Sequence, residues 1–428
     1  NRAIMRLLAG LTVTFLLTSC GPTATPSPSA APTVSATPSV AAATLPLTPA
    51  PIPVPTPTPT STPSPAATAS ASPSPVPSPL AAARWSRVPN QETFADAGMA
   101  AVAASPDRYV AVGWTGDWGA NGVAWTSADG RSWQRMPIPS AEHAAPRGII
   151  HDRLGFVAWG FDTSASTSRA AIWMSPDGVT WQRASDIPSF AFADITGIAR
   201  LGEQLVAVGM GSNNSEGPSF LAWTSDDGQA WRPVSGTEGF SATPNALAAT
   251  DTALVAPAGD GTVLRSADGL QWEVVTSPAL PGFMEFIVGS GGGFVGVGSG
   301  PSTGGAGSLP PATAWTSTDG RSWLQSALKP SALGWMGPVA AHGSEYVTLG
   351  GGFGPTFAYR STDGLTWVEM SSAPDTTREG RVAGACTGGP CSYRTTASGL
   401  ADGPLGPIAV GRTELKSGGY RAVVWILQ

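Results

Sequence analysis

The chain has 428 residues, only 12% of them charged, and it contains 53 glycines and 41 prolines. This composition disfavours a helical bundle and favours short strands joined by turns. The formal net charge of −6, with few lysines and arginines, excludes the clustered basic face that nucleic acid binding requires. The histidines, His143, His151 and His342, are too scattered for a histidine-based metal site. We expect neither a metal nor any other cofactor.

Residues 1–19 have the pattern of a secretory signal peptide. Arg2 and Arg6 precede an apolar run over residues 7–17, and small residues follow it. The run is shorter than the roughly 20 apolar residues that a membrane-spanning helix needs. Residues 17–20, Leu-Thr-Ser-Cys, also resemble the lipobox of bacterial lipoproteins. That resemblance implies acylation of Cys20, whereas the alternative is an ordinary signal peptide beside an incidental cysteine.

Residues 20–83 read as a lipidated cysteine followed by a tether. From Gly21 to Ala83 there is no charged residue, only Pro, Ser, Thr and Ala with a few other apolar residues and one glycine. Such a segment cannot bury enough apolar surface to offset the entropy of ordering it, and it favours extended polyproline II structure. We therefore expect a disordered tether and a lipid-anchored protein on the extracellular face of a bacterial membrane.

Six copies of the motif Ser-x-Asp-Gly-x-x-Trp divide residues 84–428. Their tryptophans lie 41 to 51 residues apart, which is typical of four-stranded propeller blades. The Asp-Gly pair predicts a hairpin turn in which glycine supplies the positive φ. The Asp and Ser side chains can bond backbone amides inside that turn. We therefore interpret six aspartates as structural: Asp129, Asp177, Asp227, Asp268, Asp319 and Asp363.

A second strand precedes each hairpin and occurs seven times, against six complete hairpins. The two missing half-hairpins lie at the ends of the folded region. Residues 85–89 match the strand that leaves the turn, and residues 422–426 match the strand that enters it. The sequence therefore predicts an all-β, seven-bladed β-propeller, in which the N-terminal strand completes the C-terminal blade and closes the ring. We expect this propeller to be a monomer.

The repeated motif resembles the Asp box, or BNR repeat, of the sialidase-like superfamily, which also occurs in xyloglucan-degrading hydrolases and photosystem II assembly-factor propellers. The resemblance covers residues 84–428, although the usual Ser/Thr-x-Asp-x-Gly-x-x-Trp spacing is one residue longer than the spacing here. It implies the propeller fold. It implies little about activity, because Asp boxes lie on the face away from a sialidase's active site and fold does not imply function.

A sialidase resemblance would further imply three arginines around a carboxylate, a tyrosine nucleophile polarised by a glutamate, and an aspartate acid/base. Arg87 shares its repeat position with Arg135 and Arg183, which indicates a strand residue rather than a ligand-binding one. The best remaining case for an enzyme is a set of arginines that precede innermost strands: Arg147, Arg378 and Arg381.

Two further groups of residues leave alternatives open. A pair of carboxylates would suffice for a glycosidase, and acids from different blades are available, although solvated loop positions are the favoured interpretation: Asp96, Asp194, Glu238 and Glu285. Cys386 and Cys391 lie in an insertion that lengthens the last blade. In an exported protein we expect them to form a disulfide.

The leading hypothesis is a non-catalytic propeller that recognises a glycan or protein ligand through the variable loops opposite the Asp-Gly turns. The alternatives are a glycoside hydrolase, sialidase-like or otherwise, and an assembly factor for a membrane complex. Aromatic rings can stack on sugars or peptide side chains, although the phenylalanines could instead pack between blades. The candidate ligand-face residues are Trp118, Trp335, Phe94, Phe192, Phe240, Phe283, Arg147 and Arg381.

Overall fold

The computed structural model describes residues 79–116, 121–164, 167–211, 218–237, 240, 242–259, 261–301, 310–326, 334–351, 356–376, 395–415 and 418–428. All of them belong to the compact unit Ser74–Gln428. Cys20, Trp118, Arg381, Cys386 and Cys391 lie outside the described residues, as does the predicted signal peptide. Within the described residues, no helix has the length and apolar character needed to cross a membrane.

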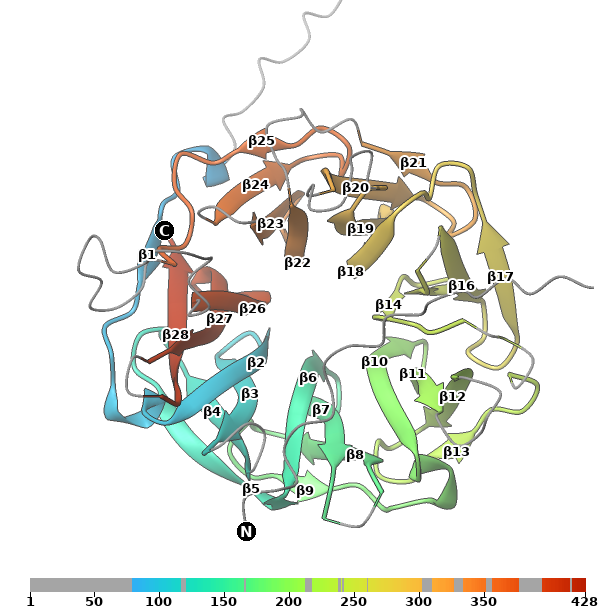
Figure 1. Ribbon diagram of the computed structural model, residues 1–428, viewed down its shortest axis with the longest axis horizontal. Coiled ribbons are helices and arrows are strands. Elements are labelled where there is room, and N and C mark those ends of the chain that lie inside the picture. Colours follow the sequence, from blue (N-terminus) through green and yellow to red (C-terminus); the bar gives the residue numbers. More distant parts are fainter. Residues whose placement is uncertain are drawn as a thin grey trace, which may run out of the picture. The chain divides into compact units, whose positions relative to one another are not determined.

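The described strands form seven antiparallel sheets of four strands each, arranged around a central opening (Figure 1). This confirms the predicted seven-bladed β-propeller. In each of blades 1 to 6 the chain runs from the innermost to the outermost strand and then enters the next blade. Among the described residues, helical structure is limited to three short 3-10 segments, η1 (Pro79–Ala81), η2 (Glu92–Phe94) and η3 (Pro188–Phe190).

The strands are as follows. Blade 1 has β2 (Ala97–Ala104), β3 (Tyr109–Thr115), β4 (Asn121–Ser127) and β5 (Gln134–Glu142), and blade 2 has β6 (Ala144–Asp152), β7 (Gly155–Asp162), β8 (Arg169–Ser175) and β9 (Gln182–Arg183). Blade 3 has β10 (Ala193–Leu201), β11 (Gln204–Gly211), β12 (Ser219–Ser225) and β13 (Arg232–Pro233), and blade 4 has β14 (Ala248–Ala249), β15 (Leu254–Pro257), β16 (Thr262–Ser266) and β17 (Trp272–Thr276). Blade 5 has β18 (Phe283–Ser290), β19 (Gly293–Ser299), β20 (Ala312–Ser317) and β21 (Leu324–Gln325), and blade 6 has β22 (Trp335–His342), β23 (Glu345–Gly351), β24 (Phe357–Ser361) and β25 (Val368–Glu369). Blade 7 has β26 (Thr395–Gly403), β27 (Gly406–Glu414), β28 (Tyr420–Leu427) and, as its outermost strand, β1 (Trp85–Arg87).

The N-terminal strand closes the ring as the sequence predicts. Trp85 pairs with Leu427 and Arg87 pairs with Trp425, so β1 completes the blade formed by the last three strands. Residues before β1 also pack on this blade, because Leu80 in η1 is only 4% exposed and belongs to the same buried cluster as Trp85.

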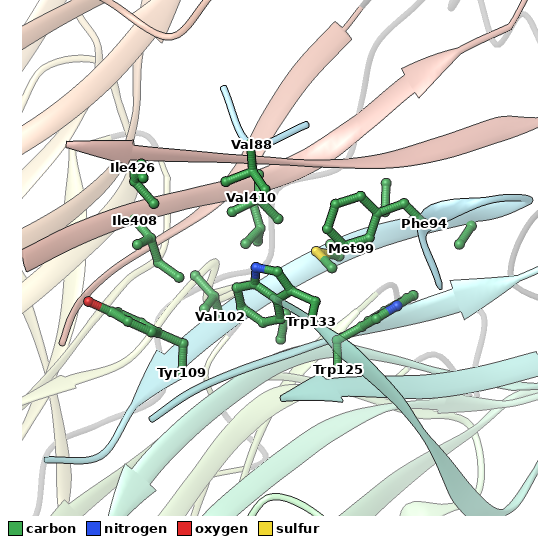
Figure 2. Packing of buried hydrophobic residues seen from close by; sticks show 14 residues of the cluster. Val88, Phe94, Met99, Val102, Tyr109, Trp125, Trp133, Ile408, Val410 and Ile426 are labelled. Carbon is green, nitrogen blue, oxygen red and sulfur yellow. The ribbon is translucent and has the colours of Figure 1, made fainter. Parts of the chain in front are cut away.

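Large side chains fill the spaces between neighbouring blades. Figure 2 shows the cluster between blades 7 and 1, where Trp125 and Trp133 lie near Phe94 and Met99. The tryptophan of the third strand is less than 2% exposed in five blades: Trp125, Trp173, Trp223, Trp315 and Trp425. Burying aromatic side chains of this size is the main apolar contribution to holding adjacent sheets together.

The alternation of antiparallel strands gives the ring two different faces. The Asp-Gly turns between third and fourth strands, together with the connections between first and second strands, lie on one side, which we call the turn face. The connections between second and third strands, together with those that lead from one blade to the next, lie on the other side, which we call the loop face. Each innermost strand therefore begins at the loop face and ends at the turn face.

Candidate functional site

The turn face is built from six nearly identical turns. In blade 2, Oδ1 of Asp177 accepts hydrogen bonds from the amides of Val179 at 2.9 Å and Thr180 at 2.7 Å. The Ser175 hydroxyl donates to the same oxygen at 3.0 Å and accepts from the amide of Gly178 at 2.8 Å. The paired amide bonds recur at the other five aspartates, Asp129, Asp227, Asp268, Asp319 and Asp363.

These hydrogen bonds hold the turn carboxylates in their ionised form. The Thr180 amide is the largest influence lowering the pKa of Asp177. At Asp319 the Ser322 amide contributes most and, with burial only partly opposing it, the pKa falls to about 2. A carboxylate that accepts several backbone N–H bonds is strongly favoured over its protonated form. Such groups stabilise a turn and are poor proton donors at neutral pH.

The motif tryptophans are anchored to the same turns. The indole Nε1 of Trp231 donates to the Gly228 carbonyl at 2.9 Å, and Trp133 bonds Gly130 in the same way at 2.9 Å. Trp231 is 3% exposed. The same bond occurs at Trp272, Trp323 and Trp367, whereas Nε1 of the buried Trp181 has no hydrogen-bond partner among the described residues. Five of the six motif tryptophans therefore join their turn to the core, which is a structural arrangement.

The candidate aromatic residues of the loop face divide into two groups. Phe94 is 1% exposed and packs in the cluster between blades 7 and 1, and Phe240 lies edge-on to Phe220 with ring centroids 6.1 Å apart. These two are packing residues. Phe192 and Phe283 are each 44% exposed. Trp335 begins β22 and is half-buried, so three aromatic side chains remain available on this face among the described candidates.

Arg147 lies inside an innermost strand, whereas its sequence position indicated a residue preceding one. It is the unpaired residue of a β-bulge in β6, between the register positions of Pro146 and Gly148. Its guanidinium lies 4.3 Å from the centroid of Phe161, and Nη1 donates to Oδ2 of Asp194 in the next blade at 2.8 Å. The ion pair thus links blades 2 and 3 near the loop face, and half of the Arg147 side chain is exposed.

An equivalent bulge in blade 5 contains an acidic residue. Glu285 is the unpaired residue between the register positions of Met284 and Phe286 in β18. Burial raises the pKa of Glu285. A bulge re-aims the side chain of its extra residue and is frequent beside functional sites. Equivalent bulges occur in five of the other innermost strands, β2, β6, β10, β22 and β26.

One surface hollow lies where the chain enters blade 1, and several of the polar atoms around it are bonded within the fold. It measures about 510 Å³ and is lined by Gln91, Glu92, Thr93, Trp133 and Arg135. The Gln91 Oε1 atom accepts from the Trp133 amide at 3.0 Å, and Arg135 donates to the Thr93 carbonyl at 2.6 Å. These bonds attach the entering chain to blade 1, so the hollow belongs to the ring closure.

No family model matches the chain, and no curated protein matches it. Among solved structures, a catalytically inactive virginiamycin B lyase from Staphylococcus aureus with quinupristin is 10% identical, with 80% of this chain and 99% of that chain covered and a TM-score of 0.50. A structure of YCF48 bound to D1 peptide is 12% identical, covering 81% and 97% of the two chains with a TM-score of 0.47. The likeness is one of fold. Any function has to be argued from the residues.

One feature of the loop face has no repeated sequence motif. The residue immediately before the innermost strand has a positive φ in five blades: Asp96 (48°), His143 (59°), Phe192 (59°), Gly282 (111°) and Gly334 (133°). Blades 5 and 6 have glycine there, which adopts this conformation without a Cβ penalty. The glycines alone could have suggested the conformation, but nothing in the sequence aligned Asp96, His143 and Phe192 with them.

Proposed function

We propose that this chain is a lipid-anchored bacterial surface protein whose propeller recognises a glycan or protein ligand on its loop face without chemical conversion. The observation that carries the proposal is the exposure of Phe192 and Phe283, each 44%, on the face where the connections differ from blade to blade. Variable connections on a rigid framework are where binding usually resides. The turns fit a shortened Asp box, whose role in this proposal is to hold that framework.

The binding proposal is tested by probing a glycan, cell-wall and peptide array with the full chain and with two variants, Phe192→Ala and Phe283→Ala. We expect wild type to bind at least one array component and at least one variant to lose most of that binding, with melting temperatures unchanged. Phe190→Ala is the contrasting variant, because Phe190 is 1% exposed and packs on Trp223. A wild-type chain that binds nothing, or two variants that bind like wild type, would contradict the proposal.

The anchor is tested separately. Replacement of Cys20 by Ser removes the sulfur that would carry the lipid, so Cys20→Ser is expected to leave the membrane fraction or to accumulate unprocessed. Fractionation of cells that express wild type and variant, followed by mass spectrometry of the N-terminus, measures both effects. Complete retention of a processed Cys20→Ser chain in the membrane would place the anchor elsewhere.

A glycoside hydrolase is the second candidate, and Glu285 is the residue that favours it. A carboxylic acid whose pKa is raised by burial suits a general acid, and Asp194 on blade 3 is an acid on the same face. Turnover of fluorogenic glycosides, sialosides included, by wild type but not by Glu285→Gln would support this function. Equal signals from wild type, Glu285→Gln and buffer would favour the binding protein.

A further inference from the structure

Asp96, His143 and Phe192 occupy one repeated position in three successive blades. Each immediately precedes an innermost strand, respectively β2, β6 and β10. In Figure 1 these strands follow one another around the central opening, and they pack side by side in that order. The three side chains are therefore placed along one arc of the loop face. All three are exposed.

The backbone at this position favours glycine, yet these three blades carry side chains there. The φ values of Asp96, His143 and Phe192 are 48°, 59° and 59°. Asp and His tolerate this left-handed region better than most residues, but a residue as bulky as Phe is an outlier in it. Blades 5 and 6 have Gly282 and Gly334 at this position, with larger φ values of 111° and 133°, so the connection can be made there without a side chain. Left-handed non-glycine residues that persist in spite of their conformational cost cluster at ligand sites.

Hydrogen bonds and an ion pair hold the backbone of this arc. The Asp96 carbonyl accepts from the Gly116 amide at 3.1 Å, and the His143 carbonyl accepts from the Thr163 amide at 2.8 Å. The Arg147–Asp194 ion pair joins the two blades that carry His143 and Phe192. These bonds fix the backbone positions from which the Asp96 and His143 side chains project. Both side chains are exposed, and the Asp96 carboxylate interacts electrostatically with Arg135.

The chemistry of the arc fits a sugar polymer better than a protein partner. Phe192 offers a ring face for the C–H side of a pyranose, Asp96 accepts hydrogen bonds from hydroxyls, and the His143 ring can both donate and accept. Phe192 and Phe283 are the exposed large hydrophobic residues of the loop face among those described. A stable protein interface needs about 800 Å² a side around a well-packed apolar centre, whereas the described residues of this face present only these two large exposed hydrophobic side chains.

The negative charge of the chain disfavours binding of an acidic polymer. The chain has a formal net charge of −6, and Asp96 adds a carboxylate to the arc itself. The positive charge of Arg147 is already paired with Asp194. We therefore infer that the loop face of blades 1 to 3 binds an extended neutral oligosaccharide, contacted by Asp96, His143 and Phe192 in turn. This inference rests on the proposed function and narrows its ligand.

Glycine substitution separates a ligand-binding role from a packing role. Asp96→Gly, His143→Gly and Phe192→Gly each remove a side chain at a backbone position that favours glycine, so we expect melting temperatures at or above that of wild type. Phe192→Ala removes the same ring but keeps the left-handed strain. Leu270→Ala removes an apolar side chain of similar exposure, 46%, from the turn face of blade 4, and serves as the control.

Binding is measured by titration calorimetry with neutral hexasaccharides of β-1,4-linked glucose, β-1,4-linked N-acetylglucosamine and α-1,4-linked glucose, and with an acidic hexagalacturonate. We expect one neutral hexamer to bind, and Phe192→Gly and Phe192→Ala each to raise its Kd about tenfold, the loss of one stacking contact. Asp96→Gly and His143→Gly are expected to raise the Kd by similar factors. Leu270→Ala is expected to bind like wild type.

Three results would overturn the inference. One is binding of hexagalacturonate in preference to every neutral hexamer, and another is loss of binding in Leu270→Ala but not in Phe192→Gly. The third is a lowered melting temperature in all three glycine variants, which would assign the side chains to packing. If wild type binds array components other than neutral sugars, the inference fails and the proposed function stands. If wild type binds nothing at all, both fail.

Discussion

The two faces of the ring are made from the same repeat but differ in how they use it. On the turn face, six turns share one set of hydrogen bonds, with each aspartate accepting from two backbone amides. On the loop face, the residue before the innermost strand has a positive φ in five blades, but its type varies: Asp96, His143, Phe192, Gly282 and Gly334. The turn face therefore keeps both its residues and its geometry, whereas the loop face keeps only the positive φ.

This difference separates stability from recognition. A repeated side chain that satisfies its own turn contributes the same stability in every blade, as the buried Trp231 and its bond to Gly228 illustrate. A side chain that differs from blade to blade, such as His143, is not required by the fold. Under the proposed function it contacts the ligand. Substitutions on the two faces should consequently affect different measurements.

The difference between the two faces depends on a closed ring. We therefore expect the largest loss of stability when the ring is opened. Deletion of residues 84–90 removes β1 (Trp85–Arg87) and buried Val88, leaving β28 with an unpaired edge. We expect the cooperative thermal transition, followed by circular dichroism, to be lost or lowered by tens of degrees. Deletion of the tether, residues 21–78, is the control and is expected to leave the transition nearly unchanged. Similar melting of the two deletions would mean that β1 is dispensable.

The next largest effect compares one aromatic residue from each face. Trp231→Ala removes a side chain that is 3% exposed, and core truncations of this size cost about 3–5 kcal/mol. Phe192→Ala removes one that is 44% exposed, and we expect a change within about 0.5 kcal/mol. Chemical denaturation of both variants measures the difference. A cost below about 1 kcal/mol for Trp231→Ala would assign the repeated tryptophans to the surface.

We expect the smallest change in stability from removing the charge of the aspartate in a single turn. The folded-state pKa of Asp319 is about 2 against an ordinary value of 3.8, so its ionised form stabilises the fold above about pH 4 and this contribution is lost as pH falls toward 2. Asp319→Asn should be less stable than wild type at pH 7 by about 1–2 kcal/mol. The gap should narrow between pH 4 and 2. Parallel stability curves over that range would contradict the assignment.

The fold could be predicted because its information is local and repeated. Each Asp-Gly pair with its following tryptophan determines a hairpin, and the half-hairpins at residues 85–89 and 422–426 determine the closure. The loop face could not be predicted in the same way. The bulge at Arg147 depends on pairing with β7, and the left-handed residues sit at the ends of connections that differ in length and sequence. Sequence spacing therefore indicated Phe94 and Phe192 equally, although only Phe192 is exposed.

The pairing of Trp85 with Leu427 and of Arg87 with Trp425 also has a consequence for how the chain folds. These contacts join the two ends of the folded region, and contacts of such long sequence separation are the slowest to form. A chain that emerges N-terminus first can form blades 1 to 6 while blade 7 still awaits its last strands. During that interval β1 has no partner. Ring closure therefore has to wait for the last strands, and we expect the open edge of the incomplete ring to be prone to edge-to-edge association until then.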